Sequence, residues 1–357
     1  MFGSAVQVVF QAPSDGLVQR QEGRLQAAQL DEALQQGREL VARLADLLDA
    51  PWGAIDARAG AAAARCIEQA VMLARRAEVS AIVTAAAIGA GRPLFAQSAK
   101  SPYLSDLGIQ LYTLRNEIAK DVNATIKAVA AAGYKQVEMY GFPNCDAMVK
   151  AARDSGLALN SSHFEWDSVV NPKDDSYSDF SKILDKAKEV GLKHLVIPYL
   201  ADGNRKTLDD YKKVAAHANK AAALAKSAGI QLSYHNHNFE FEPKENGVSG
   251  FDVFVKEFSA DMKFELDVFW VKAGGLDPVE LVNKLKGRVT QLHLKDLKKD
   301  IPIPSYSSVP ADAFQEVGDG IIAMAPLLAA AQEAGVEHCH VEQDQSPDAL
   351  ASIKQSI

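Results

Sequence analysis

The strongest constraint on the fold is a repeat of short apolar runs and amphipathic stretches that begins near Leu107. Several amphipathic stretches end in a glycine, and an apolar run follows within a few residues, as in AAGYKQVEM, EVGLKHLVI and SAGIQLSY. Glycine is favoured just past a helix because left-handed backbone is needed there. Alternating helices and apolar strands of this kind predict a parallel sheet with helices on its faces.

Eight strands are expected, at 107–112, 136–139, 158–162, 194–198, 231–235, 263–267, 289–294 and 338–342. Eight such units in about 250 residues predict a closed (β/α)8 barrel, the TIM barrel fold. A doubly wound open sheet is the alternative. No GxGxxG follows the first strand, so nothing in the sequence favours a dinucleotide-binding fold.

The first hundred residues have a different character. Leucines at helical spacing between residues 25 and 48 predict a helical extension over 1–71. Residues 72–100 carry paired arginines, a run of small apolar residues and then Leu-Phe-Ala-Gln, which is the order of an export signal. We hypothesise that translation begins at or near Met72 and that 1–71 is not part of the mature protein. An Ala-rich helix packed on the barrel domain (105–357) is the alternative for 72–100.

The signal predicts a periplasmic location if it is used and a cytoplasmic one otherwise. Its apolar run is too short to span a bilayer, so no membrane anchor is expected. The formal net charge is −8 and there is no basic block, which argues against a nucleic-acid partner. Three widely spaced cysteines predict no thiolate zinc site. The sequence is compatible with a homo-oligomer and does not specify the oligomeric state.

Six of the eight predicted strands end in, or run into, a titratable side chain: Glu138, His163, His235, Asp267, His293 and Glu342. Each alone is explained by hydrogen bonding or helix capping. In a barrel, however, the carboxyl ends of all strands meet at one mouth. Imidazoles and carboxylates together suit a first-row divalent ion. His237 lies on the same side as His235 by strand alternation, and the sequence does not decide which of the two is a ligand.

The pieces LGIQLYTLR, GYKQVEMYG, SSHFEW, GIQLSYHNHNFEF, FELDVFWV, VTQLHLKD, EVGDGII and HVEQD follow one another in the chain. Together they resemble the xylose-isomerase-like barrels of the sugar phosphate isomerase/epimerase superfamily, over about 107–357. In motif they are closest to the inosose dehydratase and 3-keto-glycoside lyase type. The resemblance implies one divalent metal ion (Mn, Co, Fe, Zn or Mg) held by His235, Asp267, His293 and Glu342.

At the position of His235 this family usually has a glutamate. Two carboxylates then neutralise the ion instead of three, and a less neutralised ion is a stronger Lewis acid. This difference favours elimination among the outcomes that the resemblance allows. We therefore expect the divalent ion and its two carboxylate ligands to have a net charge near zero, whereas three carboxylates would leave a net charge of −1.

The resemblance implies an isomerase or epimerase that enolises a keto-sugar or a ketone derived from a polyol. The alternative is a lyase or dehydratase that eliminates a β-substituent from a 3-keto-glycoside or an inosose. Glu342 would be a ligand and a base, and His237 an acid/base group or substrate contact. His163, Glu138 and Lys295 would contact substrate or act as acids.

Two further readings have less support: an abasic-site endonuclease, which needs more metal ligands and a basic surface, and a sugar-binding barrel without activity. Residues 297–313 form a long connection that is typical of a lid. Trp166 and Trp270 follow strand ends and are candidates for stacking on a sugar ring, with core packing as the alternative.

Overall fold

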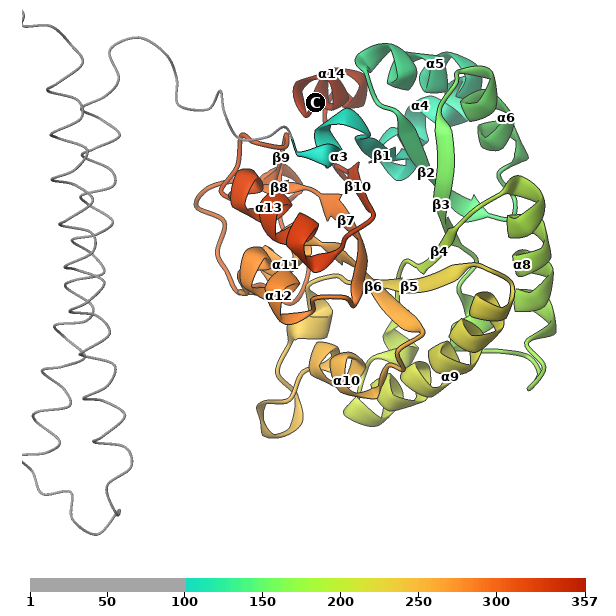
Figure 1. Ribbon diagram of the computed structural model, residues 1–357. Coiled ribbons are helices and arrows are strands. Elements are labelled where there is room, and N and C mark those ends of the chain that lie inside the picture. Colours follow the sequence, from blue (N-terminus) through green and yellow to red (C-terminus); the bar gives the residue numbers. More distant parts are fainter. Residues whose placement is uncertain (1–100) are drawn as a thin grey trace, which may run out of the picture. The chain divides into compact units, whose positions relative to one another are not determined.

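The computed structural model describes residues 101–357, which form a closed barrel of eight parallel strands (Figure 1). Around the barrel the strand order is β1, β10, β7, β6, β5, β4, β3, β2. The strands are β1 (Gly108–Gln110), β2 (Gln136–Phe142), β3 (Ala158–Phe164), β4 (His194–Ile197), β5 (Gln231–His235), β6 (Met262–Asp267), β7 (Val289–Leu294) and β10 (His338–Val341). The predicted TIM barrel is confirmed, and the open sheet is excluded. The predicted helical extension (1–71) and export signal (72–100) lie outside the described residues.

Helices connect the strands and cover the outside of the barrel (Figure 1). They are α3 (Pro102–Ser105), α4 (Arg115–Lys120), α5 (Val122–Ala132), α6 (Asp146–Asp154), α7 (Asp167–Val170), α8 (Ser178–Val190), α9 (Leu208–Ser227), α10 (Gly250–Glu257), α11 (Val268–Ala273), α12 (Pro278–Lys284), α13 (Met324–Ala334) and α14 (Ala349–Gln355). The predicted glycine exits are present: Gly191 ends α8 with φ 87° and Gly335 ends α13 with φ 82°. Both angles are in the left-handed region that glycine tolerates best. Among the described helices, none is long and apolar enough to cross a membrane.

The interior of the barrel is polar, whereas the space between the strands and the helices is apolar. Gln110, Glu138, Ser161, Glu265 and Gln291 are fully buried. Bonds between opposite strands hold some of them in place, such as that from Gln291 Nε2 to Ser161 Oγ at 3.1 Å. TIM barrels usually fill this space with aliphatic side chains. Buried polar groups are costly unless they are paired, so their concentration here indicates a functional interior.

The long connection after β7 is more ordered than the sequence indicated. It begins at β8 (Asp296–Leu297), which pairs antiparallel with β9 (Phe314–Gln315) and closes the base of the loop. At the loop tip, Asn238 Nδ2 donates to the carbonyl oxygens of Ser305 at 2.9 Å and Ser307 at 2.6 Å. These bonds fasten the loop to the segment that follows β5. A lid function for the loop stays a prediction.

Candidate metal centre

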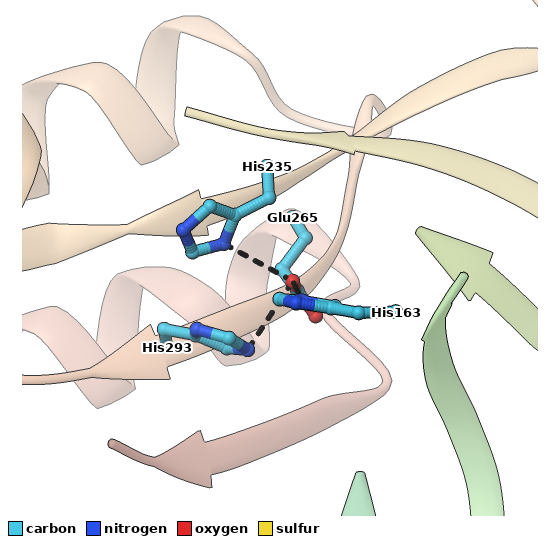
Figure 2. Close-up of side chains that lie close together, drawn as sticks. All are labelled: His163, His235, Glu265 and His293. Atoms are coloured by element: carbon cyan, nitrogen blue, oxygen red, sulfur yellow. Dashed lines mark hydrogen bonds and ion pairs between the residues drawn. The ribbon is translucent and has the colours of Figure 1, made fainter. Parts of the chain in front are cut away.

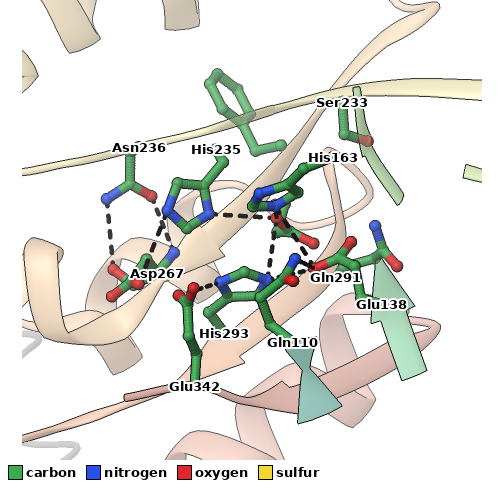
Figure 3. Close-up of polar contacts among 12 residues, drawn as sticks. Gln110, Glu138, His163, Ser233, His235, Asn236, Asp267, Gln291, His293 and Glu342 are labelled. Carbon is green, nitrogen blue, oxygen red and sulfur yellow. Dashed lines mark hydrogen bonds and ion pairs between the residues drawn. The ribbon is translucent and has the colours of Figure 1, made fainter. Parts of the chain in front are cut away.

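The four predicted metal ligands converge at the carboxyl ends of four neighbouring strands, β5, β6, β7 and β10 (Figure 3). His235 and Asp267 are the last residues of β5 and β6, His293 lies on β7, and Glu342 directly follows β10. One ligating atom from each lies within 4.8 Å of the others. All four side chains are buried, with at most 5% of the residue exposed.

The residue between the two histidines of HNH links β5 to β6. Asn236 Oδ1 accepts a hydrogen bond from the Asp267 backbone N–H at 3.0 Å, and its Nδ2 donates to the Asp267 carbonyl at 3.3 Å. The Asp267 carboxylate in turn caps α11 by accepting from the Trp270 backbone N–H at 3.0 Å. The helix-cap role that the sequence suggested for Asp267 therefore coexists with its place in the cluster.

Glu265 lies at the centre of the imidazoles (Figure 2). Its Oε2 atom is 2.9 Å from His163 Nε2, 3.2 Å from His235 Nδ1 and 3.2 Å from His293 Nε2. Glu265 was not among the predicted site residues, because only one titratable side chain was taken from the end of each strand. The signal was present, since alternation in FELD places Glu265 on the same side of β6 as Asp267.

Glu138 lies with Glu265 in the layer of the barrel interior below the proposed metal ligands. It does not line the cavity described below. Its carboxylate accepts hydrogen bonds from Gln110 Nε2 at 2.9 Å and from Ser161 Oγ. It is also 2.6 Å from His293 Nε2 and 3.5 Å from His163 Nε2. Its contacts are therefore with the rings that face the site.

Lys295 is 1% exposed and is surrounded by carboxylates. Its Nζ atom is 2.9 Å from Asp267 Oδ2, 2.7 Å from Glu342 Oε2 and 2.9 Å from Asp344 Oδ2. Asp344, which the sequence analysis did not single out, thus belongs to the same network. One ammonium and three carboxylates therefore lie together at the inner end of the site, where the Asp344 side chain is 20% exposed and the other three are nearly or fully buried.

Burial and pairing shift the pKa values of this network in opposite directions. Burial lowers the pKa of His293, but Glu265, Glu342 and Glu138 outweigh it and hold that pKa well above its usual range. Burial also lowers the pKa of Lys295, and Asp267, Asp344 and Glu342 raise it well above normal. Burial and the neighbouring His293 lower the pKa of His235, so its imidazole is neutral. A neutral imidazole is the form that binds a metal, so His293 would release its proton when an ion binds.

A cavity of about 510 Å³ opens onto the cluster. Its lining includes His163, Trp166, His235, His237, Lys295 and Glu342. Of the two tryptophans predicted to stack on a sugar ring, Trp166 lines this cavity, whereas Trp270 lines an adjacent one. His237 forms a wall between the two cavities and stacks on Phe239 with a centroid distance of 5.4 Å.

The donor set fits a divalent ion. Nδ1 of His235 and Nε2 of His293 face Glu265, which leaves His235 Nε2 3.8 Å from Asp267 Oδ2 and His293 Nδ1 2.9 Å from Glu342 Oε2. Metal-binding histidines commonly donate their second nitrogen to a carboxylate in this manner. Asp267 Oδ2 is buried and faces the Lys295 ammonium at 2.9 Å, so this oxygen already pairs with a positive charge in the structure.

Two other buried groups of four overlap this set, and they show how tightly the ligand-type side chains are packed. One joins His163, His235, Glu265 and His293, and the other joins Glu138, Glu265, His293 and His340. Glu265 and His293 belong to both. The set with Asp267 and Glu342 is the one that combines four strand ends with the cavity.

Comparison with known proteins agrees with this architecture. A model of the family described as xylose isomerase-like TIM barrel matches residues 126–357. Among curated proteins, the inosose dehydratase of Clostridium beijerinckii is 24% identical over 249 residues, covering 62% of this chain and 82% of that protein.

Two solved structures extend the comparison. A sugar phosphate isomerase/epimerase from Parabacteroides distasonis ATCC 8503 superposes with a TM-score of 0.58 at 25% identity, covering 74% of this chain and 96% of that chain. The IolI protein, whose structure contains a binding zinc atom, has a TM-score of 0.53 at 15% identity, covering 70% and 95%. The second likeness concerns the fold alone.

Proposed function

This chain belongs to the xylose isomerase-like TIM barrel family, and we propose that it is a metal-dependent enzyme that enolises a keto-sugar or a ketone derived from a polyol. One observation carries the proposal: two imidazoles and two carboxylates from four strand ends meet beside a buried ammonium, at a cavity of about 510 Å³. A cavity of this size accommodates a small molecule. Fold alone does not determine the reaction, so these side chains support the proposed chemistry.

His235, Asp267, His293 and Glu342 would hold one Mn, Co, Fe, Zn or Mg ion. When bound, the ion would supply Lewis acidity that makes the C–H next to a carbonyl more acidic. Glu265 would orient His235 and His293, because its carboxylate contacts the second nitrogen of each ring. His235 is the proposed ligand rather than His237, since His237 belongs to none of the four-residue groups.

The residues at the cavity surface would move the protons. Glu342 and His237 can accept the proton from the carbon, because both line the cavity and Glu342 is ionised. Lys295, whose pKa is raised, would stay an ammonium and donate to the oxygen on which negative charge develops. His163 faces the same cavity and would contact a substrate hydroxyl. Glu138 would position His163 and His293 rather than touch substrate.

Elimination is the second candidate outcome, and the similarity to a protein named inosose dehydratase favours it. After the proton leaves, its electron pair forms a carbon–carbon double bond and the β carbon–oxygen bond breaks. The departing oxygen would take its proton from His163, which lines the cavity, while the Lys295 ammonium keeps its protons and donates a hydrogen bond to the enolate oxygen. The products are an unsaturated ketone and water or an alcohol, and no redox cofactor is needed.

A test in deuterated water separates these outcomes. The metal-loaded full chain is incubated with a 3-keto-glycoside, an inosose and free ketoses. Deuterium next to the carbonyl with the carbon skeleton intact indicates isomerisation or epimerisation. Release of an alcohol or water with an unsaturated ketone indicates a lyase. No exchange with any of these substrates, with bound metal verified, would contradict the enolisation proposal.

A further inference from the structure

A second group of ligand-type side chains lies at the opposite end of the barrel from the candidate metal centre. It consists of His194, Glu337 and His338, which we call the floor cluster. His194 and His338 are the first residues of β4 and β10, and Glu337 immediately precedes β10. Because all eight strands are parallel, their first residues share the end of the barrel away from the mouth.

The two histidines of the floor cluster come from opposite sides of the barrel. Three strands separate β4 from β10 in either direction around the sheet (Figure 1). Their rings nevertheless meet, with centroids 5.4 Å apart and planes at 87°. His194 Nε2 is 3.5 Å from Glu337 Oε2, and one ligand atom from each of the three residues lies within 4.8 Å of the others.

The contact between His194 and Glu337 leaves two ring nitrogens of the floor cluster without a hydrogen-bond partner among the described residues. Nδ1 of His194 and Nδ1 of His338 are both buried and have no hydrogen-bond partner within 101–357. His194 itself is only 2% exposed. Buried polar nitrogens are normally paired, and two orphans within one three-residue group indicate a missing partner.

We propose that the floor cluster binds one ion of the zinc class, namely Zn²⁺, Co²⁺, Ni²⁺ or Cu²⁺. Two imidazoles and one carboxylate match the preference of these ions, whereas Mg²⁺ and Ca²⁺ prefer oxygen throughout. Solvent reaches the site because the Glu337 side chain is 55% exposed and borders, with His194, an open cavity of about 510 Å³. Water would complete a four-coordinate shell.

Such an ion would tie β4 to β10 across the barrel and act as a structural clamp. The inference does not depend on the proposed function, because none of the three residues belongs to the candidate metal centre.

The test is the number of zinc ions bound by the full chain without an affinity tag, measured by equilibrium dialysis and elemental analysis. All eight histidines of the chain lie within the described residues, so each can be varied in its structural context. We expect His338→Ala to bind one zinc ion fewer than the unmodified chain. His217→Ala is the matched control: His217 pairs with Tyr177 on the outside of the barrel and should leave the stoichiometry unchanged.

Glu337→Gln provides a second variant that preserves size, in case His338→Ala perturbs folding; circular dichroism checks both. This variant should lose the same ion or bind it more weakly by at least tenfold. Cobalt gives an independent signal, since a four-coordinate site absorbs strongly in the visible range and this absorption should fall in both variants. Equal zinc stoichiometry, zinc affinity and cobalt spectra in the folded variants and the unmodified chain would overturn the proposal.

Discussion

The carboxylate of Glu265 lies 3.2 Å from Nδ1 of His235, one layer below the proposed metal ligands. Two carboxylates are expected among those ligands, and with a divalent ion they give a net charge near zero rather than −1, because His235 stands where the family usually has glutamate. The structure adds a buried carboxylate behind the same ring. Burial raises the pKa of Glu265, but His293 and His163 outweigh it and hold that pKa well below its usual range, so the charge is present.

Glu265→Gln should weaken metal binding while leaving the four proposed ligands in place. The amide removes a negative charge behind His235 and His293, and loss of such an outer partner typically costs about 10–100-fold in metal affinity. Isothermal titration with Zn²⁺ or Mn²⁺ gives the dissociation constant. Glu257→Gln, at an exposed carboxylate, is the control and should not change it. An unchanged dissociation constant in Glu265→Gln would remove Glu265 from the centre.

Substitutions of the two histidines of HNH should have different effects on metal binding. His235→Ala is expected to lose more than the roughly 10–100-fold in affinity that an outer partner costs, since it deletes a proposed ligand. His237→Ala should keep the metal and lose turnover, because His237 lines the cavity but belongs to no group that brings four ligands together. The reverse pattern would show that His237 is the ligand.

Lys295→Met should destabilise the metal-free protein by about 3–5 kcal/mol, because it leaves buried carboxylates without their cation. A divalent metal ion replaces part of that charge, so added Mn²⁺ should raise the melting temperature more in the variant than in the unmodified chain. Urea unfolding with and without metal measures both effects. Lys298→Met removes an exposed pair with Asp312 and should cost no more than about 1 kcal/mol. An equal rise in melting temperature on adding Mn²⁺ to the variant and to the unmodified chain would contradict the idea that Lys295 and the metal ion pair with the same carboxylates.

The barrel was predictable because its signal is local. Apolar runs and glycines after helices mark each unit, and all eight strands were expected within a few residues of their observed positions. The short strands β8 and β9 were not, because two-residue strands carry no periodicity. Their pairing depends on a turn in the chain that only the assembled fold provides.

The proposed ligands were also accessible from the sequence, since each ends or follows a strand. The contacts of the layer below these ligands could not be predicted from the sequence. Glu138 and His293 meet at 2.6 Å although 155 positions separate them, and that contact follows from the closure of the barrel. Lys295 was named as a substrate contact, but its three carboxylate partners come from β6 and from the segment after β10. Such distances between strand ends depend on stagger, which a single sequence does not specify.

Glu240 should make the stability of the protein depend on pH. Burial raises its pKa from 4.5 to about 7, although its carboxylate accepts hydrogen bonds from Tyr234 Oη and from the His237 backbone N–H at 2.8 Å. The folded state therefore binds this proton more tightly than the unfolded state. Its stabilising contribution is full below about pH 4.5 and is lost as the pH rises through about 7, by roughly 3 kcal/mol at about 1.4 kcal/mol per pKa unit.

Glu240→Gln removes this dependence, because the amide oxygen can still accept from the His237 N–H and the amide nitrogen can donate to Tyr234. The variant should match the unmodified chain near pH 4.5 and become more stable than it, by up to roughly 3 kcal/mol, near pH 8. Urea unfolding at several pH values gives the difference in the free energy of unfolding between the two chains. The titration of the other carboxylates contributes equally to both chains and cancels in this difference. Glu242→Gln, at a neighbouring exposed position, should show no such trend. A constant difference across the range would mean that Glu240 is ionised throughout.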